Sequence, residues 1–166
     1  MFRTYITTGR ATKMNDSDRV SKARDLFSQG YNCAQAVFCA YSDLYGLDFE
    51  TSLKISSGFG GGFGRMREVC GAFSGITMIA GLERESAEAF DKAAVYEQIR
   101  LLADEFKKRN GSIICSELLD TKKSPESHVP EKRTQEYMKK RPCPQIVEEA
   151  ARIIEEYVLK DRSKDE

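Results

Sequence analysis

The stretch GFGGGFGRMREVCGAFSGITMIAG, residues 58–81, organises the rest of this chain. It opens with five glycines in seven residues, and Cys70 follows six residues after the last of them, Gly64. Glycine loses more chain entropy on folding than other residues, so a run this dense indicates backbone that passes where a Cβ would not fit. A thiol directly after such a run predicts that backbone amides gather around its sulfur.

Composition and charge exclude several classes of function. Apolar residues make up 40% of the 166-residue chain and charged residues 31%, and the net charge is zero. We therefore expect one globular domain with no nucleic-acid partner. No apolar run approaches the roughly 18 residues that cross a bilayer, so we expect no membrane insertion. Five cysteines without an export signal predict a reducing, cytoplasmic setting, where spaced cysteines more often bind metal or react than form structural disulfides.

Capping residues and helical spacing predict an all-α fold. We expect an irregular bundle of about five to seven helices with a glycine-rich interhelical loop, in which Gly71 and Gly75 form a smooth packing face. Strands are not expected, because period-2 alternation is absent. The expected domain spans residues 14–160, after a disordered extension at 1–13 and before a solvated tail at 161–166. The expected helices cover residues 16–29, 32–45, 49–57, 66–82, 86–109 and 143–158.

The polar segment 121–141 shows no periodicity and contains two prolines. Connections longer than about a dozen residues are usually functional or disordered. We expect a lid or a loose connection.

Four cysteines are the candidate reactive groups. Cys33 and Cys143 fall at expected helix N-termini, with Cys143 at the N-cap, and Cys115 lies close to another helix start. A helix N-terminus favours thiolate over thiol, and Cys70 follows the glycine run. Cys39 lies about 240° around its helix from Cys33, at ~100° per residue, so we expect it to pack in the core. Inert burial is the alternative for every one of these cysteines.

Two kinds of chemistry suit four thiols from separate segments. One is an iron–sulfur cluster or another thiolate-bound metal, and the other is a reversible dithiol–disulfide site. The sequence has no C-x-x-C motif, and this absence argues more strongly against a structural zinc site than against an iron–sulfur cluster. Because the four cysteines come from four separate segments, the sequence slightly favours a metal centre over a disulfide site. Amides of Gly60, Gly61, Gly62 and Gly71 could bind such a cofactor, although a tight interhelical connection explains the glycines equally well.

The other titratable residues give weaker indications. His128 is the one histidine of the chain and lies in the polar segment, where pairing with a thiol would require folding back. Arg65 and Arg67 could stabilise a thiolate or an anion, but solvated positions are expected. Solvated positions are also expected for Glu68 and Glu117.

Several pieces of the sequence together resemble the C_GCAxxG_C_C family of redox-active proteins. They are NCAQAV at 32–37, GFGGG at 58–62, CGAFSG at 70–75, Cys115 and Cys143. The resemblance covers roughly residues 20–157. It implies that Cys33, Cys70, Cys115 and Cys143 act together and leaves Cys39 out. Here the order is Cys-Gly-Ala where the family name has Gly-Cys-Ala, and the family brings no settled substrate.

The sequence therefore predicts a redox-active protein, either an oxidoreductase or an electron-transfer protein, that works through four clustered cysteines. In the disulfide version, Cys33 or Cys143 is the attacking thiolate. A non-catalytic metal-binding or helical interaction module is the alternative. A redox partner is expected but not identified, and homo-oligomerisation is left open.

Overall fold

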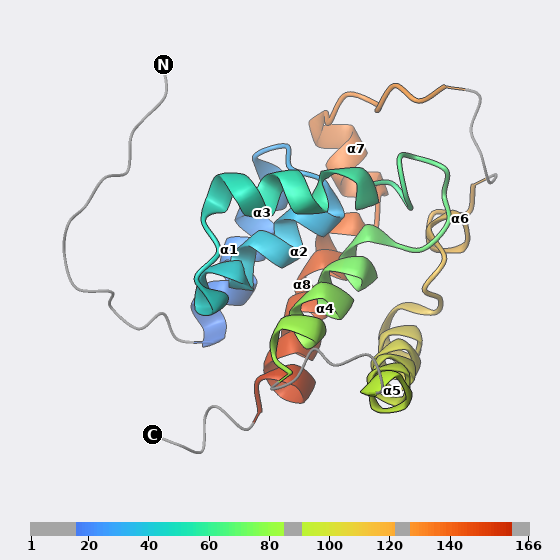
Figure 1. The fold of residues 1–166 in the computed structure, drawn as a ribbon. Helices are drawn as coiled ribbons and strands as arrows, with labels where there is room; N and C mark the ends of the chain where they lie inside the picture. Colours follow the sequence, from blue (N-terminus) through green and yellow to red (C-terminus); the bar gives the residue numbers. More distant parts are fainter. Residues whose placement is uncertain (1–15, 85–90, 122–126, 161–166) are drawn as a thin grey trace, which may run out of the picture.

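The computed structural model describes residues 16–84, 91–121 and 127–160. In these ranges the chain forms helices and no strand, with one isolated bridge between Val69 and Ile114. The prediction of an all-α bundle is confirmed (Figure 1). The helices are α1 (Asp16–Ser28), α2 (Cys33–Tyr41), α3 (Phe49–Ser56), α4 (Gly71–Leu82), α5 (Lys92–Asn110), α6 (Cys115–Leu118), α7 (Gln135–Lys140) and α8 (Cys143–Ile153).

Local capping explains where the early helices begin. The Asn32 side chain accepts a hydrogen bond from the Gln35 amide, and the Gln35 side chain accepts one from the Asn32 amide. This reciprocal capping box starts α2 with Cys33 as its first residue. Asp48 caps α3 by accepting from the Thr51 amide. Both starts agree with the sequence prediction.

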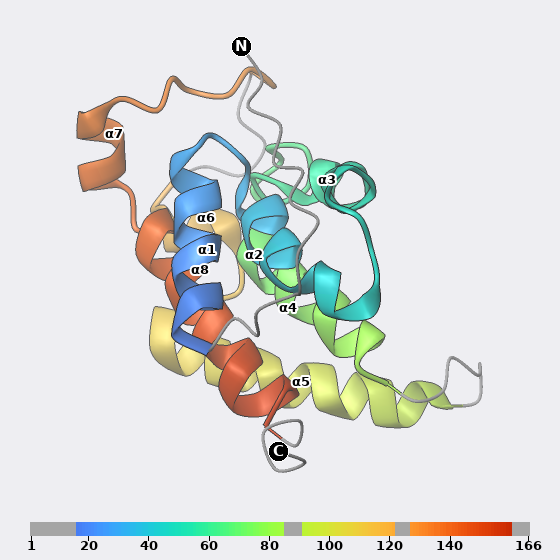
Figure 2. The same ribbon diagram turned by 90° about the vertical axis from the view of Figure 1, so that its left-hand side faces the viewer.

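Helix α2 is the centre of the bundle, and it packs against α1, α3, α4 and α8 (Figures 1 and 2). Seven of its nine residues are buried. The small-residue face of α4 allows its close approach, because a Cβ on Gly75 would lie 2.7 Å from the Val37 Cβ. The Tyr41 hydroxyl donates to the Ala151 carbonyl oxygen at 3.1 Å, which ties α2 to α8.

The prediction that α4 begins near residue 66 was wrong, because the helix begins at Gly71 with Cys70 as its N-cap. Residues 67–70 instead pair with the chain before and at the start of α6. The Cys70 amide donates to the Ile113 carbonyl at 2.7 Å, and the Cys115 amide donates to the Glu68 carbonyl at 2.6 Å. These two hydrogen bonds place Cys70 and Cys115 on neighbouring segments of the chain.

Three other expectations need correction. The segment 121–141 contains helix α7, which Thr134 caps and which sequence periodicity did not reveal because the helix is short and mostly polar. In α8, Cys143 is the first helical residue and Pro142 takes the cap position, one residue earlier than predicted. Helical spacing of apolar residues also predicts that Ala94 lies on a buried stripe of α5, but Ala94 is exposed, because the buried residues of α5, Leu102, Ala103 and Phe106, lie in its C-terminal half.

Some predictions are not tested. The extension at residues 1–13, the tail at 161–166 and the expected start of α5 at residues 86–90 lie outside the described residues. The single-domain boundaries and the cytoplasmic setting stay predictions. In the described ranges, no helix combines the length and apolarity that a bilayer span requires.

Candidate functional site

A cavity of about 280 Å³ lies where several helices begin, at the end of the bundle that carries α6 and α7 (Figure 1). Cys33, Cys70, Cys115 and Cys143 all line it. Cys33, Cys115 and Cys143 are the first residues of α2, α6 and α8, and Cys70 is the N-cap of α4. The structure therefore brings the four predicted cysteines to one cavity. All of them stand at helix N-termini, including Cys70, for which the sequence had not indicated this.

Two of these thiols interact directly. Hydrogen bonding with Cys33 is the largest influence on the pKa of Cys143 and lowers it to about 7. The positive charges of Arg141, Arg133 and Arg67 lower it further, against the opposing effect of burial. The same hydrogen bond, with burial, raises the pKa of Cys33 well above its usual value. Near pH 7 Cys143 is therefore about half thiolate, whereas Cys33 keeps its proton.

The other two thiols differ from Cys143. Burial raises the pKa of Cys70 to about 12, although the backbone amides of Ala72 and Phe73 hydrogen-bond its sulfur. Burial also raises the pKa of Cys115, despite Arg67, whose Nη1 lies 3.7 Å from the Cys115 Sγ. Position at a helix N-terminus therefore does not by itself produce a thiolate here, because burial outweighs it at both cysteines.

A left-handed turn forms the wall of the cavity beside Cys115. Residues 61–65 all have positive φ, between 54° and 68°, and Arg67 follows with φ 64°. The turn is closed by the Arg67 and Glu68 amides, which donate to the Gly61 and Gly62 carbonyls at 3.1 Å each. A left-handed conformation costs a non-glycine residue roughly 1–2 kcal/mol. Phe63, Arg65 and Arg67 all adopt it, so backbone strain is concentrated next to the thiols.

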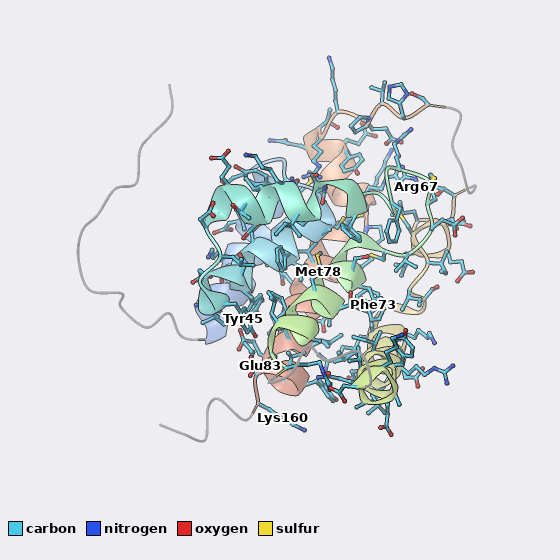
Figure 3. The ribbon with its side chains drawn as sticks, viewed as in Figure 1. Tyr45, Arg67, Phe73, Met78, Glu83 and Lys160 are labelled. Carbon is cyan, nitrogen blue, oxygen red and sulfur yellow. The ribbon has the colours of Figure 1, made fainter. Side chains whose placement is uncertain are left out.

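This turn directs two arginines at the cavity, and the expectation that both are solvated was wrong. The Arg65 side chain is only 16% exposed, and Arg67 is half-buried. Arg67 lies between the glycine-rich segment and α6 (Figure 3). Both arginines line the cavity. Glu117 is exposed, as predicted, whereas Glu68 is half-buried.

The glycines predicted to bind a cofactor lie on the cavity wall, where they permit close packing. A Cβ on Gly60 would lie 2.4 Å from the Asn32 Cγ, and one on Gly62 would lie 2.8 Å from the Cys115 Cβ. A Cβ on Gly71 would lie 2.9 Å from the Phe59 carbonyl oxygen. Gly61 completes the left-handed turn. A cofactor-binding role for these glycines stays a prediction.

Residues 127–134 border the cavity from the other side. Glu131 accepts from Arg141 through both carboxylate oxygens at 2.9 Å and pairs with Arg65 at 3.4 Å. Arg133 donates to the Phe27 carbonyl and lies over the Phe27 ring. His128 also lines the cavity. The segment predicted as a lid or loose connection thus contributes charged residues to the site.

Cys39 does not line this cavity. Its side chain is 1% exposed in the core, and burial raises its pKa. All five cysteines are free thiols. Across the ranges described, no group of three or more His, Cys, Asp or Glu side chains is arranged to hold a metal ion. Four thiols share the cavity, and among them Cys33 and Cys143 shift each other's pKa in opposite directions.

Sequence reasoning had missed Arg133 and Arg141, and it had placed Arg67 in solvent. No local signal marks them, since the tertiary fold brings Arg67 and Arg133 to the cavity wall and Arg141 to Glu131, which lines the cavity. The cysteine spacing, by contrast, located all four thiols.

Comparison with known proteins gives one match. A family model described as "Putative redox-active protein (C_GCAxxG_C_C)" matches residues 31–157. That range contains all four cavity cysteines. No curated protein and no solved structure matches the chain.

Proposed function

Because this chain belongs to the C_GCAxxG_C_C family, which is described as redox-active, we propose that it carries out dithiol–disulfide exchange through Cys143 and Cys33. The observation that carries the proposal is that the half-buried Cys33 and Cys143, the first residues of α2 and α8, line one cavity, where Cys33 lowers the pKa of Cys143 to about 7. An attacking thiolate and an adjacent second thiol are the two groups that such exchange requires.

The reaction proceeds in two displacements. The Cys143 thiolate attacks one sulfur of a substrate disulfide, whose S–S bond breaks and whose other half leaves as a thiolate. The new Cys143 mixed disulfide no longer carries the negative charge that held the Cys33 proton. Cys33 therefore loses its proton to the departing thiolate and attacks the Cys143 sulfur, which releases the second substrate thiol. The substrate gains two electrons, and a dithiol reductant returns the Cys33–Cys143 disulfide to its reduced form.

The position of each sulfur supports these roles. Cys33 and Cys143 are half-buried residues of the cavity wall, whereas Cys70 and Cys115 are buried. The pKa of Cys143 near 7 suits an attacking thiol, because the best attacking thiols have a pKa close to the ambient pH. We therefore assign attack to Cys143 and resolution to Cys33.

A thiolate-bound metal or iron–sulfur cluster is the second candidate, and the convergence of four cysteines on one cavity favours it. Cys33, Cys70, Cys115 and Cys143 would be the ligands. Binding would require Cys70 and Cys115 to lose their protons against burial, and the four sulfurs to move into a common cage. Dithiol exchange needs only Cys33 and Cys143, whose pKa values already differ as the reaction requires, so we place it first.

Thiol mapping tests the dithiol proposal. Fully reduced protein is equilibrated in buffers of increasing disulfide-to-dithiol ratio, quenched by alkylation, and mapped by peptide mass spectrometry. We expect a single Cys33–Cys143 cross-link. Cys33→Ser should accumulate a mixed disulfide on Cys143, Cys143→Ser should remain unreacted, and the buried control Cys39→Ser should behave as the unmodified protein. A cross-link between other cysteines, or none, would overturn the assignment.

A further inference from the structure

We propose that the substrate of this site is a small disulfide whose arms end in carboxylates, drawn in and oriented by Arg67 and Arg133. This inference rests on the proposed dithiol function and adds the chemical class of the substrate. It follows from the charge of the cavity wall, from the way that charge is held, and from the size of the cavity.

The wall of the cavity carries an excess of positive charge. Among the residues that the structure describes, its lining includes the three arginines Arg65, Arg67 and Arg133 and one carboxylate, Glu131. That carboxylate is already shared between Arg65 and Arg141. A cleft lined by one sign of charge concentrates ligands of the opposite sign.

Within residues 16–84, 91–121 and 127–160, no carboxylate pairs with the cavity arginines Arg67 and Arg133. Their hydrogen bonds go to uncharged groups, from Arg67 to the Cys115 sulfur at 3.7 Å and from Arg133 to the Phe27 carbonyl. Guanidinium groups bind carboxylates in a bidentate geometry. A substrate carboxylate would therefore add a charge-assisted contact without breaking an existing ion pair.

The backbone at Arg67, which lines the cavity, adopts a strained left-handed conformation. Arg67 has φ 64° two residues after the run of left-handed residues 61–65, and its amide donates to the Gly61 carbonyl. Strained backbone of this kind persists where the surrounding structure requires it, often at binding sites. The strain therefore serves to fix a positive charge beside Cys115 and near Cys143.

The size of the cavity favours a small molecule over a protein disulfide. Its volume is about 280 Å³, close to the lower end of ligand pockets. The reactive sulfurs stand half-buried in its wall, and apolar groups of Phe27, Leu118 and Ile146 also line it. Short aliphatic arms with terminal carboxylates match this combination of apolar and cationic lining.

The test compares three disulfides of similar size and different charge. They are 3,3′-dithiodipropionate with two negative charges, bis(2-hydroxyethyl) disulfide with none, and cystamine with two positive charges. Each rate of oxidation of the reduced protein is divided by the rate of 2-mercaptoethanol with the same disulfide, which removes differences between leaving thiols. We expect the normalised rates to fall from anion to neutral to cation, with the anion about tenfold ahead of the neutral compound at low salt.

Matched variants identify the charge that is responsible. Arg67→Gln and Arg133→Gln should each reduce the anion-to-neutral ratio several-fold, and about 0.5 M salt should reduce it in the unmodified protein through screening. Arg100→Gln, on the exposed face of α5, removes the same charge far from the cavity and should leave the ratio unchanged. The salt series and the cystamine comparison need no variant, so they apply even if one variant fails to fold.

The outcomes separate the two proposals. If all three disulfides produce the Cys33–Cys143 cross-link at equal normalised rates, or if the ratio survives loss of either arginine, the substrate class is wrong and the dithiol function stands. If none of them produces that cross-link, both proposals are wrong.

Discussion

Alanine substitutions at three glycines of the glycine-rich segment should change the stability of the protein to different extents. Gly58, Gly62 and Gly64 lie within seven residues of one another, but alanine would meet different surroundings at each. At Gly62 φ is +68°, and an added Cβ would lie 2.6 Å from the Glu68 nitrogen and 2.8 Å from the Cys115 Cβ. At Gly64 φ is +54° but nothing lies within 4 Å, and at Gly58 neither restriction applies.

These differences set the expected change in the free energy of unfolding. Gly64→Ala should cost about 1–2 kcal/mol, which is the cost of a left-handed non-glycine residue. Gly62→Ala adds steric overlap with the backbone, at about 1–3 kcal/mol, for a total of about 2–5 kcal/mol. Gly58→Ala should be neutral or should stabilise by up to about 1 kcal/mol, because alanine restricts the unfolded chain.

Urea unfolding followed by circular dichroism measures all three variants against the unmodified protein, with the midpoints compared at constant slope. The Gly62→Ala midpoint should be the lowest, and the rate of alkylation of Cys115 should change in that variant alone. If Gly62→Ala is no more destabilising than Gly64→Ala, the close approach of the turn to Cys115 is wrong.

Three further predictions concern charge, conformation and packing. Because its pKa is lowered to about 7, Cys143 is a thiolate above that pH and a thiol below it. Its alkylation by iodoacetamide should therefore fall about tenfold per pH unit below 7, and a midpoint near pH 9 would contradict the pair. Asp120 has φ 50°, so Asp120→Gly should stabilise by about 1 kcal/mol, whereas Asp104→Gly inside α5 should destabilise by about as much; thermal unfolding that shows the same sign for both would refute this. Tyr41→Phe removes the buried hydrogen bond to the Ala151 carbonyl and should cost about 0.5–1.5 kcal/mol in urea unfolding, and no loss would contradict that contact.

Most helices could be predicted from sequence because their signals are local. The capping box of Asn32 and Gln35 and the cap at Asp48 each act within one turn of their helix. The start of α4 could not be predicted in this way. Its displacement from residue 66 to Gly71 depends on the left-handed turn and on hydrogen bonds to residues 113–115, which are remote in sequence.

In the candidate site, too, features with local sequence signals could be predicted and features that depend on the tertiary fold could not. The grouping of Cys33, Cys115 and Cys143 could be anticipated, because each lies at or near an expected helix start, whereas the position of Cys70 as the N-cap of α4 could not. Which two would pair could not be predicted, since Cys143 is set apart by the hydrogen bond from Cys33 and by arginines from three segments. Burial of Cys70 and Cys115, which keeps them protonated, is likewise a product of the tertiary fold.

The central claim is that the four-cysteine cavity works as a dithiol site. Anaerobic purification, followed by an absorption spectrum, metal and sulfide analysis and thiol titration before and after mild oxidation, tests it most directly. We expect colourless, metal-free protein whose five free thiols fall to three when the Cys33–Cys143 disulfide forms. Stoichiometric iron and labile sulfide with absorption in the visible region, or stoichiometric zinc, would contradict the claim and make the four cysteines metal ligands.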